Sequence, residues 1–182
     1  MTIHVIHEIR RIDRWQTLQH EIEKHHLTVN YWPAIMDSMI SFRGVARAHK
    51  SIVRWAKENN LPEVLIAEDD FKLLGKGAFE YYLNNKPADY DLYLGGIFGG
   101  EIKDNIVPDF AGLSFYMVHS RFYDAFLAAN EMNNFDRSLA NLGKYVVCNP
   151  IIVSQYGGYS DNKKEYVADY DHLLKQYNTY ND

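Results

Sequence analysis

The sequence has little cysteine, no excess of positive charge and no long apolar run. Its 182 residues contain a single cysteine, Cys148, and the formal net charge is −5. One thiol cannot form an internal disulfide, and no cysteine–histidine spacing suggests a zinc site. Cys148 lies in an apolar context, so we expect a buried core thiol. An acidic chain lacks the positive electrostatic potential that attracts the phosphate backbone of DNA or RNA, which argues against a nucleic-acid partner.

No apolar run approaches the roughly 18 residues that a transmembrane helix needs. No secretory leader is recognised, because the first residues lead directly into charged ones. We therefore expect a cytoplasmic protein without a transmembrane segment, peripheral at the inner membrane face if its acceptor is lipid-linked. The hydrophobic content of 47% excludes a disordered chain. The length fits one domain over residues 1–182, with a flexible tail at 178–182.

Apolar periodicity predicts strands that alternate with helices in the first half of the chain. Strands are expected at 3–7, 28–32, 64–67, 90–94 and 113–118, and helices at 13–24, 44–58, 79–83 and 122–129. This alternation predicts an α/β fold with a mostly parallel central sheet flanked by helices, and a less regular C-terminal half. Asp13, Ser120 and Asp136 are the expected helix N-caps, and a weak amphipathic helix is expected over 166–177.

The stretch from Val64 to Asp70 is an apolar run that ends in three consecutive acids. A run of this kind predicts a strand buried on both faces, and Glu68, Asp69 and Asp70 then lie at its carboxyl end. Ligands of open α/β sheets bind at that edge. Oxygen ligands suit Mg²⁺ or Mn²⁺ carrying phosphates. The alternative is a solvated loop or a first helical turn.

Four blocks of this sequence resemble glycosyltransferase family 25, the lipopolysaccharide and collagen-type galactosyltransferases. The blocks are the arginine-rich segment 10–14, the helix start 44–49 with His49, the strand 65–70 that ends in Glu-Asp-Asp, and a downstream series of Phe115–Val118, Asp136, Val146–Ile151, Gln155 and Ser160–Asp161. The family's serine before the histidine is Ala48 here, and the chain is shorter than typical members. The likeness covers roughly residues 3 to 162.

The resemblance implies a GT-A-like fold and a metal-bound donor. It implies that Asp70 binds Mn²⁺ (or Mg²⁺) directly, and that Glu68 or Asp69 reaches the metal through water or holds the ribose. The cation would bridge the diphosphate of a nucleotide sugar. Metal ligands are therefore expected at Asp70 and Glu68, and donor contacts at Glu68 and Asp69.

The remaining site residues follow from the same resemblance, each beside a structural alternative. Arg10 and Arg14 would contact the nucleotide or its phosphates, or belong to a solvated helix start. His49 is a nucleotide contact or a hydrogen-bonded histidine at the core edge. Asp136 would deprotonate the acceptor hydroxyl, as inversion requires, or only cap a helix. Asp161 approaches the metal or the sugar, or forms a turn.

The resemblance to this family implies a metal-dependent glycosyltransferase. It would transfer a hexose such as galactose from a nucleotide sugar, expected to be UDP-linked, to a cell-surface glycan such as lipopolysaccharide. The first alternative is a degenerate nucleotide- or sugar-binding domain, which Ala48 and the short length favour. The second is a Mg²⁺-dependent phosphotransferase or hydrolase. Against it, the first strand ends in His7 and Glu8 and then arginines, without an aspartate nucleophile.

Overall fold

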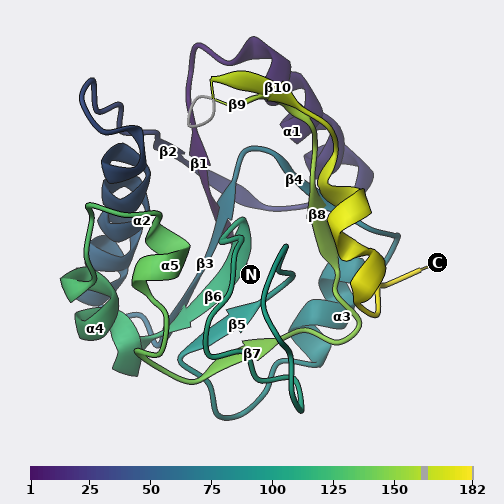
Figure 1. Cartoon of the computed structure of the whole chain (residues 1–182). Helices are drawn as coiled ribbons and strands as arrows, with labels where there is room; N and C mark the ends of the chain where they lie inside the picture. Colours follow the sequence, from purple (N-terminus) through teal and green to yellow (C-terminus); the bar gives the residue numbers. More distant parts are fainter. Residues whose placement is uncertain (161–163, 182) are drawn as a thin grey trace.

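The computed structural model describes residues 1–160 and 164–181 and arranges them as a central sheet with helices on both faces (Figure 1). The elements in order are β1 Ile3–His7, α1 Ile12–Lys24, β2 Val29–Pro33, α2 Ser41–Glu58, β3 Glu63–Glu68, β4 Phe71–Leu73, α3 Ala78–Asn84, β5 Leu92–Leu94, β6 Phe115–His119, η1 Ser120–Phe122, α4 Tyr123–Ala128, α5 Phe135–Ser138, β7 Tyr145–Val147, β8 Val153–Gln155, β9 Gly158–Ser160, β10 Glu165–Val167 and η2 Tyr170–Gln176. Among these residues, no helix is both long and apolar enough to cross a membrane.

The central sheet has six strands in the order β2-β1-β3-β6-β5-β7. Strands β1, β2 and β3 pair in parallel, as do β5 and β7, and only β6 runs against its neighbours β3 and β5. The carboxyl ends of five strands therefore meet at one edge of the sheet. This arrangement confirms the predicted α/β class and mostly parallel sheet.

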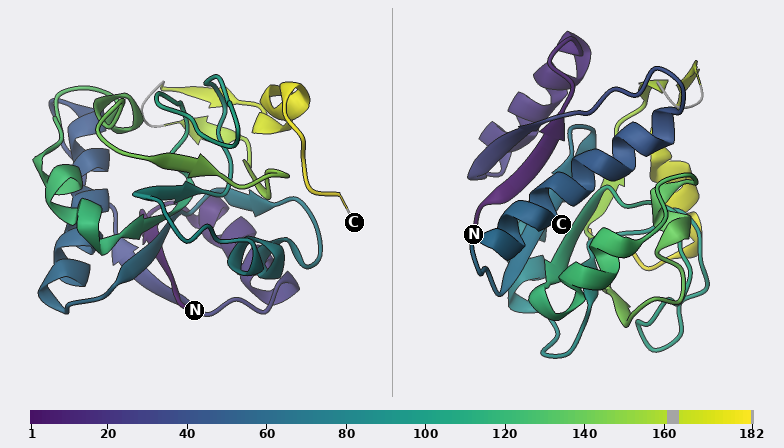
Figure 2. Two further views of the ribbon diagram at one scale, coloured as in Figure 1. Left: turned by 90° about the horizontal axis from the view of Figure 1, so that it is seen from below. Right: turned by 90° about the vertical axis from the view of Figure 1, so that its left-hand side faces the viewer.

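Successive residues of β3 enter two different cores, as the period of a strand requires. Val64 and Ile66 pack with α2, α4 and α5, whereas Leu65 and Ala67 pack with α1 and α3. Figure 2 shows α2 and α4 in front of the sheet in its right-hand view. Because both faces are covered, β3 is apolar at consecutive positions until Glu68, and its charged end lies at the sheet edge.

Glycine permits two close approaches that hold loops of the carboxyl edge in place. A Cβ on Gly44 would lie 2.1 Å from the carbonyl oxygen of Ile35, so the loop after β2 packs directly on α2. A Cβ on Gly96 would lie 2.6 Å from the carbonyl oxygen of Val153. The glycine-rich loop after β5 thus packs closely against the C-terminal half.

Several local expectations were wrong. The N-caps that the sequence predicted lie one or two residues inside the actual helix starts. The N-cap is Arg11 for α1 instead of Asp13, His119 for η1 instead of Ser120, and Asn134 for α5 instead of Asp136.

The C-terminal segment also differs from its prediction. Residues 166–177 form the end of β10 and the 3₁₀ helix η2 rather than an amphipathic α-helix. Within the stretch 178–181, Asn178 O accepts from Ile151 N at 2.9 Å, and Tyr180 N donates to Ile151 O at 2.8 Å; the flexibility of the tail stays a prediction. Residues up to Val167 pair with β9, which leaves only the short segment 170–176 to form helical turns.

Candidate functional site

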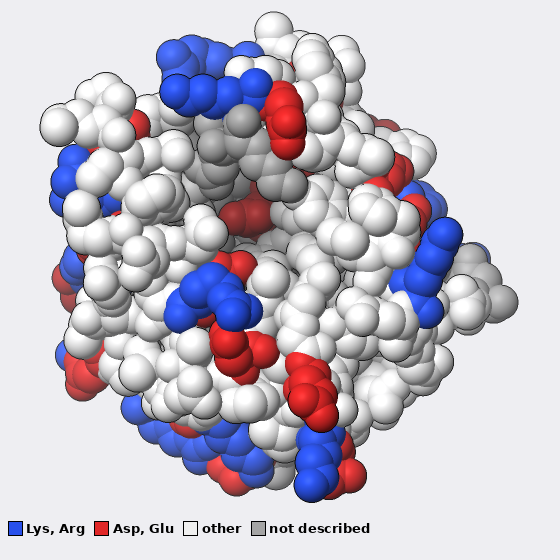
Figure 3. Space-filling view, viewed as in Figure 1, with Lys and Arg blue, Asp and Glu red and all other residues white. Residues whose placement is uncertain are grey.

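Three adjacent carboxylates, Glu68, Asp69 and Asp70, form what we call the acid cluster at the carboxyl end of β3. Asp69 and Asp70 are buried and Glu68 is partly buried. The turn they form leads into β4, which pairs with β8 and brings Gln155 opposite Phe71. Figure 3 shows a hollow in this view of the molecule, with acidic atoms at its floor. The chain therefore places buried negative charge at the edge where α/β sheets bind ligands.

Arg14 supplies the cation that these buried carboxylates require. Its Nη1 lies 2.8 Å from Asp69 Oδ1 and 3.1 Å from Asp70 Oδ2. The second oxygen of Asp69 accepts a hydrogen bond from Nδ1 of His7 at 2.8 Å. Arg14 comes from α1 and His7 from the end of β1, so two neighbouring elements hold the two aspartates of the cluster from one side.

Glu68 is held from the other side by α2 and β8. His49 Nε2 lies 3.3 Å from Glu68 Oε1, and its Nδ1 lies 2.7 Å from the hydroxyl of Tyr116. With Nε2–H donating to the carboxylate, Nδ1 accepts the hydroxyl proton of Tyr116. Gln155 Nε2 donates to both Glu68 at 3.0 Å and Asp70 at 2.9 Å. One amide thus bridges two members of the acid cluster.

These contacts give the carboxyls different proton affinities. Burial raises the pKa of Asp70 to about 7, and the charges of Glu68 and Asp69 add to this rise while Arg14 opposes it. Burial acts in the same direction on Asp69, but the hydrogen bond from His7 and the charge of Arg14 hold its pKa below the usual value. Asp69 is therefore the ionised anchor for Arg14, whereas the charge of Asp70 is less well compensated than that of Asp69.

Asp136 reaches the same region from α5. The preceding residue, Phe135, packs its ring 6.0 Å from that of His49, measured between ring centroids. The two carboxyl oxygens of Asp136 accept backbone hydrogen bonds from Gly112 at 2.8 Å and Arg137 at 2.7 Å. Burial raises the pKa of Asp136, and the charge of Glu68 contributes to the rise. A carboxyl held in this way has a fixed position and increased basicity.

The other predicted site residues lie outside the acid cluster or outside the described residues. Arg10 is exposed and donates to Glu8 Oε1 at 2.7 Å, and Arg11 pairs with Asp13. His172 of η2 also lies apart from the acid cluster, and its Nδ1 contacts the backbone carbonyl of Asp169 at 2.8 Å. Asp161 lies outside the described residues.

Two residues of the acid cluster's surroundings have no role assigned from the sequence. His7 is the last residue of β1, and no local pattern marks it as a partner of Asp69. Gln155 belongs to the downstream series of the family resemblance, which was the one available signal. Its contacts depend on the pairing of β4 with β8, which sequence periodicity does not predict.

The acid cluster has the right donor chemistry for a divalent cation, because hard oxygen ligands suit Mg²⁺ and Mn²⁺. Burial is the main cause of the raised pKa of Asp70, and the negative charges of Glu68 and Asp69 beside it add to the rise. Within residues 1–160 and 164–181, no three His, Cys, Asp or Glu side chains form a ready-made metal-binding group. Sites of this type often combine one or two carboxylates with substrate phosphates. The residues therefore fit a cation that arrives with a phosphate ligand and competes with Arg14.

Solved structures that resemble this chain include nucleotide-binding proteins. A mutant Drosophila β-1,4-galactosyltransferase 7 in complex with manganese, UDP-Gal and xylobiose aligns with a TM-score of 0.51 and 9% identity, over 100% of this chain and 75% of that chain. HddC from Yersinia pseudotuberculosis, complexed with GMP-PN, aligns with a TM-score of 0.46 and 8% identity, over 81% of this chain and 89% of that one.

A glycosyltransferase involved in the glycosylation of the major capsid of PBCV-1 aligns with a TM-score of 0.41 and 14% identity. The alignment covers 69% of this chain and 62% of that chain. A scan against protein-family models gives no match, and a search of the curated proteins gives no significant one. At these identities, the likeness to the galactosyltransferase concerns the fold, and it confirms a GT-A-like arrangement.

Proposed function

We propose that this protein is a metal-dependent glycosyltransferase of the family 25 type. It would transfer a hexose, galactose being the first candidate, from a UDP-sugar to a glycan such as lipopolysaccharide. The observation that carries this proposal is the acid cluster at the carboxyl end of β3, built into a GT-A-like sheet. Buried carboxylates at this edge are costly to fold, and a cationic ligand compensates that cost.

Each residue of the proposed site has a stated task. Asp70 and Glu68 would hold a divalent cation, which when bound neutralises charge on the donor diphosphate. Asp69 stays ionised and holds Arg14, whose guanidinium matches phosphate oxygens and would turn toward the donor. His49, fixed by Tyr116, orients Glu68.

Asp136 is the proposed general base. It would accept the proton of the acceptor hydroxyl while that oxygen attacks the anomeric carbon from the face opposite the leaving diphosphate, which inverts the configuration. Its two backbone hydrogen bonds fix the carboxylate, and its raised pKa increases its affinity for the proton.

The first test is thermal unfolding with UDP, GDP and CMP, each with and without Mn²⁺. Saturating UDP with Mn²⁺ should raise the melting temperature by about 5 °C, because binding to the folded state alone adds stability. D70A should lose this gain. D124A is the matched control, since Asp124 is an exposed carboxylate on α4. A gain that survives in D70A contradicts the assigned metal site.

A catalytically degenerate nucleotide-binding domain is the second candidate. It is favoured by the finding that Glu68, Asp69 and Asp70 all have protein partners already. Release of UDP from a UDP-hexose separates the two: slow hydrolysis indicates an enzyme, whereas binding without any release indicates the degenerate domain.

A further inference from the structure

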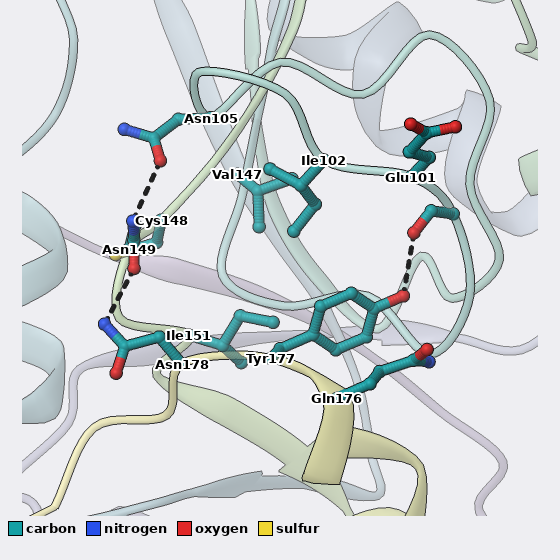
Figure 4. Close-up of a pocket in the computed structure, with 11 residues that line it drawn as sticks. Glu101, Ile102, Asn105, Val147, Cys148, Asn149, Ile151, Gln176, Tyr177 and Asn178 are labelled. Carbon is teal, nitrogen blue, oxygen red and sulfur yellow. Dashed lines mark hydrogen bonds between the residues drawn. The ribbon is translucent and has the colours of Figure 1, made fainter.

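A second recess of about 550 Å³ lies beside the end of β7 and does not involve the acid cluster (Figure 4). It is bordered by the loop after β5, the residues that follow β7, and the chain after η2. Its apolar floor contains the buried side chains of Val147 and Ile151, together with the partly buried Ile102. Its rim carries exposed amides. An apolar floor with a few polar groups around it is the usual design of a small-ligand site.

Three asparagines from three separate segments form a chain of hydrogen bonds along one side of this recess. Asn178 Nδ2 donates to Asn149 Oδ1 at 2.9 Å, and Asn149 Nδ2 donates to Asn105 Oδ1 at 3.0 Å. Figure 4 shows this asparagine ladder running down one wall. Among the described residues, Nδ2 of Asn105 and Oδ1 of Asn178 have no hydrogen-bond partner. The ladder therefore presents a free donor at one end and a free acceptor at the other.

The backbone of each ladder residue is also fixed. The carbonyl of Asn105 accepts from Val147 N at 2.8 Å, and that of Asn178 accepts from Ile151 N at 2.9 Å. The carbonyl of Asn149 accepts from the hydroxyl of Tyr81 at 2.8 Å. A ligand would therefore meet amides that are already in position, which lowers the entropic cost of binding.

The turn that carries Asn105 adds to this rigidity. Asp104 and Asn105 have φ of 51° and 62°, and Lys103 and Ile106 exchange backbone hydrogen bonds of 2.9 Å across them. Two successive left-handed residues in a two-residue connection form the tight turn typical of β-hairpins, and asparagine and aspartate tolerate this conformation well.

The chemistry of the recess selects a neutral ligand with many hydroxyl groups. Among the described residues, no lysine or arginine lines it, and the one charged residue of its lining is Glu101. Opposite the ladder, Tyr177 offers a ring held by its hydrogen bond to Gly100 O at 2.9 Å. Sugars combine an apolar C–H face with hydroxyls that pair with amides. Cys148 also borders the recess, but burial raises its pKa to about 11, so it is a neutral thiol wall.

We propose that this recess, the asparagine pocket, binds an uncharged sugar residue of the acceptor glycan. As an acceptor site it rests on the proposed function, whereas glycan binding itself does not require it. The segment from Ile151 to Gln155 connects the pocket to the acid cluster, and four extended residues span about 13 Å. A single sugar ring cannot bridge that distance. The pocket would therefore hold a residue of an oligosaccharide remote from the one that reacts.

The test uses the whole chain, without nucleotide or metal, and two neutral probes, lactose and methyl β-galactoside. Saturation-transfer NMR should detect both, with millimolar affinity. N105A and N178A, which remove the ladder ends, should each weaken lactose binding about fivefold, the loss of roughly one hydrogen bond. N59A is the matched control, because Asn59 is an exposed amide that bonds to Trp55 O on α2.

A second variant guards against misfolding. I102W should fill the recess from a partly exposed loop position, so lactose binding should disappear while the unfolding temperature stays unchanged. Glucuronate should bind less well than the neutral probes because Glu101 repels it. The proposal is overturned if wild-type protein binds neither neutral probe, if N59A weakens lactose as much as N105A and N178A, or if glucuronate binds equally well. UDP binding, measured separately, decides the proposed function.

Discussion

The acid cluster and the asparagine pocket lie at the same edge of the sheet, but the protein treats them in opposite ways. The carboxylates of the acid cluster are buried or partly buried, and each has partners from distant elements, including Arg14 and Gln155. The amides of the asparagine pocket are exposed and leave hydrogen-bonding atoms unused. An uncompensated buried charge is far more costly than an exposed amide. The carboxylates of a charged site therefore need protein partners before the ligand binds, whereas the amides of a neutral site can keep unused hydrogen-bonding atoms for the ligand.

The largest expected effect is that of replacing Asp136. This change would separate the transfer reaction near the acid cluster from sugar binding in the asparagine pocket. D136N should lower the rate of sugar transfer by about 10²- to 10⁴-fold, the usual contribution of a general base. Donor affinity and lactose binding should stay unchanged. Initial rates of UDP release with acceptor, together with calorimetric titration of the donor, measure both.

Asp109 provides the control for this prediction. It is a partly exposed carboxylate that pairs with Arg137, next to Asp136 in sequence. D109N should keep its activity. Full turnover in D136N would remove Asp136 from the mechanism and leave it a structural role.

The second prediction tests whether Arg14 is the internal competitor of a metal. R14A should raise the affinity for Mn²⁺ in the absence of nucleotide by about tenfold, since Asp69 and Asp70 lose their nearest positive charge. The same change should lower the free energy of unfolding by about 1 to 3 kcal/mol, because buried charge is left unpaired. Calorimetry and denaturant unfolding give the two values.

R14K is the conservative control for Arg14. It retains the charge and should keep the weak Mn²⁺ affinity of the wild type. If R14A binds Mn²⁺ no more tightly than wild type, Arg14 and the metal do not share a site.

The third prediction concerns the loss of stability that ionisation of the buried Asp70 causes. Asp70 has a pKa of about 7 in the folded state against an ordinary 3.8. It binds a proton more tightly when folded, so stability should fall as pH rises from about 4 to about 7. D70N should reduce this fall by about 1 to 2 kcal/mol, a cautious fraction of the full linkage value. Denaturant unfolding across that pH range measures it.

D124N serves as the matched change at an exposed carboxylate on α4, and its pH profile should follow the wild type. If the free energy of unfolding depends on pH in the same way in wild type and D70N, Asp70 does not cause the expected fall in stability.

The smallest expected effect is that of salt, which should act on ligand binding at the acid cluster but hardly on binding in the asparagine pocket. Raising the ionic strength from about 0.05 M to about 0.5 M should weaken binding of UDP with Mn²⁺ several-fold, because charged partners are screened. Lactose binding at the asparagine pocket should change by less than a factor of about two, since no charge pairing is involved. Titrations of both ligands in the same buffers test this, and equal salt sensitivity would contradict the division between the sites.

The sequence predicted the fold class well because the apolar repeats of helices and of strands are local properties of the chain. The consecutive apolar residues Val64 to Ala67 indicated a strand covered on both faces, and the structure confirms it. Local signals were less reliable at element ends. Asp13 has the chemistry of a cap, but its carboxylate pairs with Arg11 instead. In the weakly helical stretch 166–177, pairing with the nearby β9 takes up the residues to Val167, and only the 3₁₀ helix η2 follows.

By itself, the sequence determined that three acids follow a doubly buried strand, and hence that negative charge lies at a sheet edge. Only the tertiary structure decided what meets that charge, because Arg14 and Gln155 are 55 and 85 positions away from their partners in the acid cluster. The asparagine ladder likewise joins residues 29 and 44 positions apart. Neighbours within a few residues are fixed by backbone geometry, but neighbours at such separations depend on which strands pair and in which order.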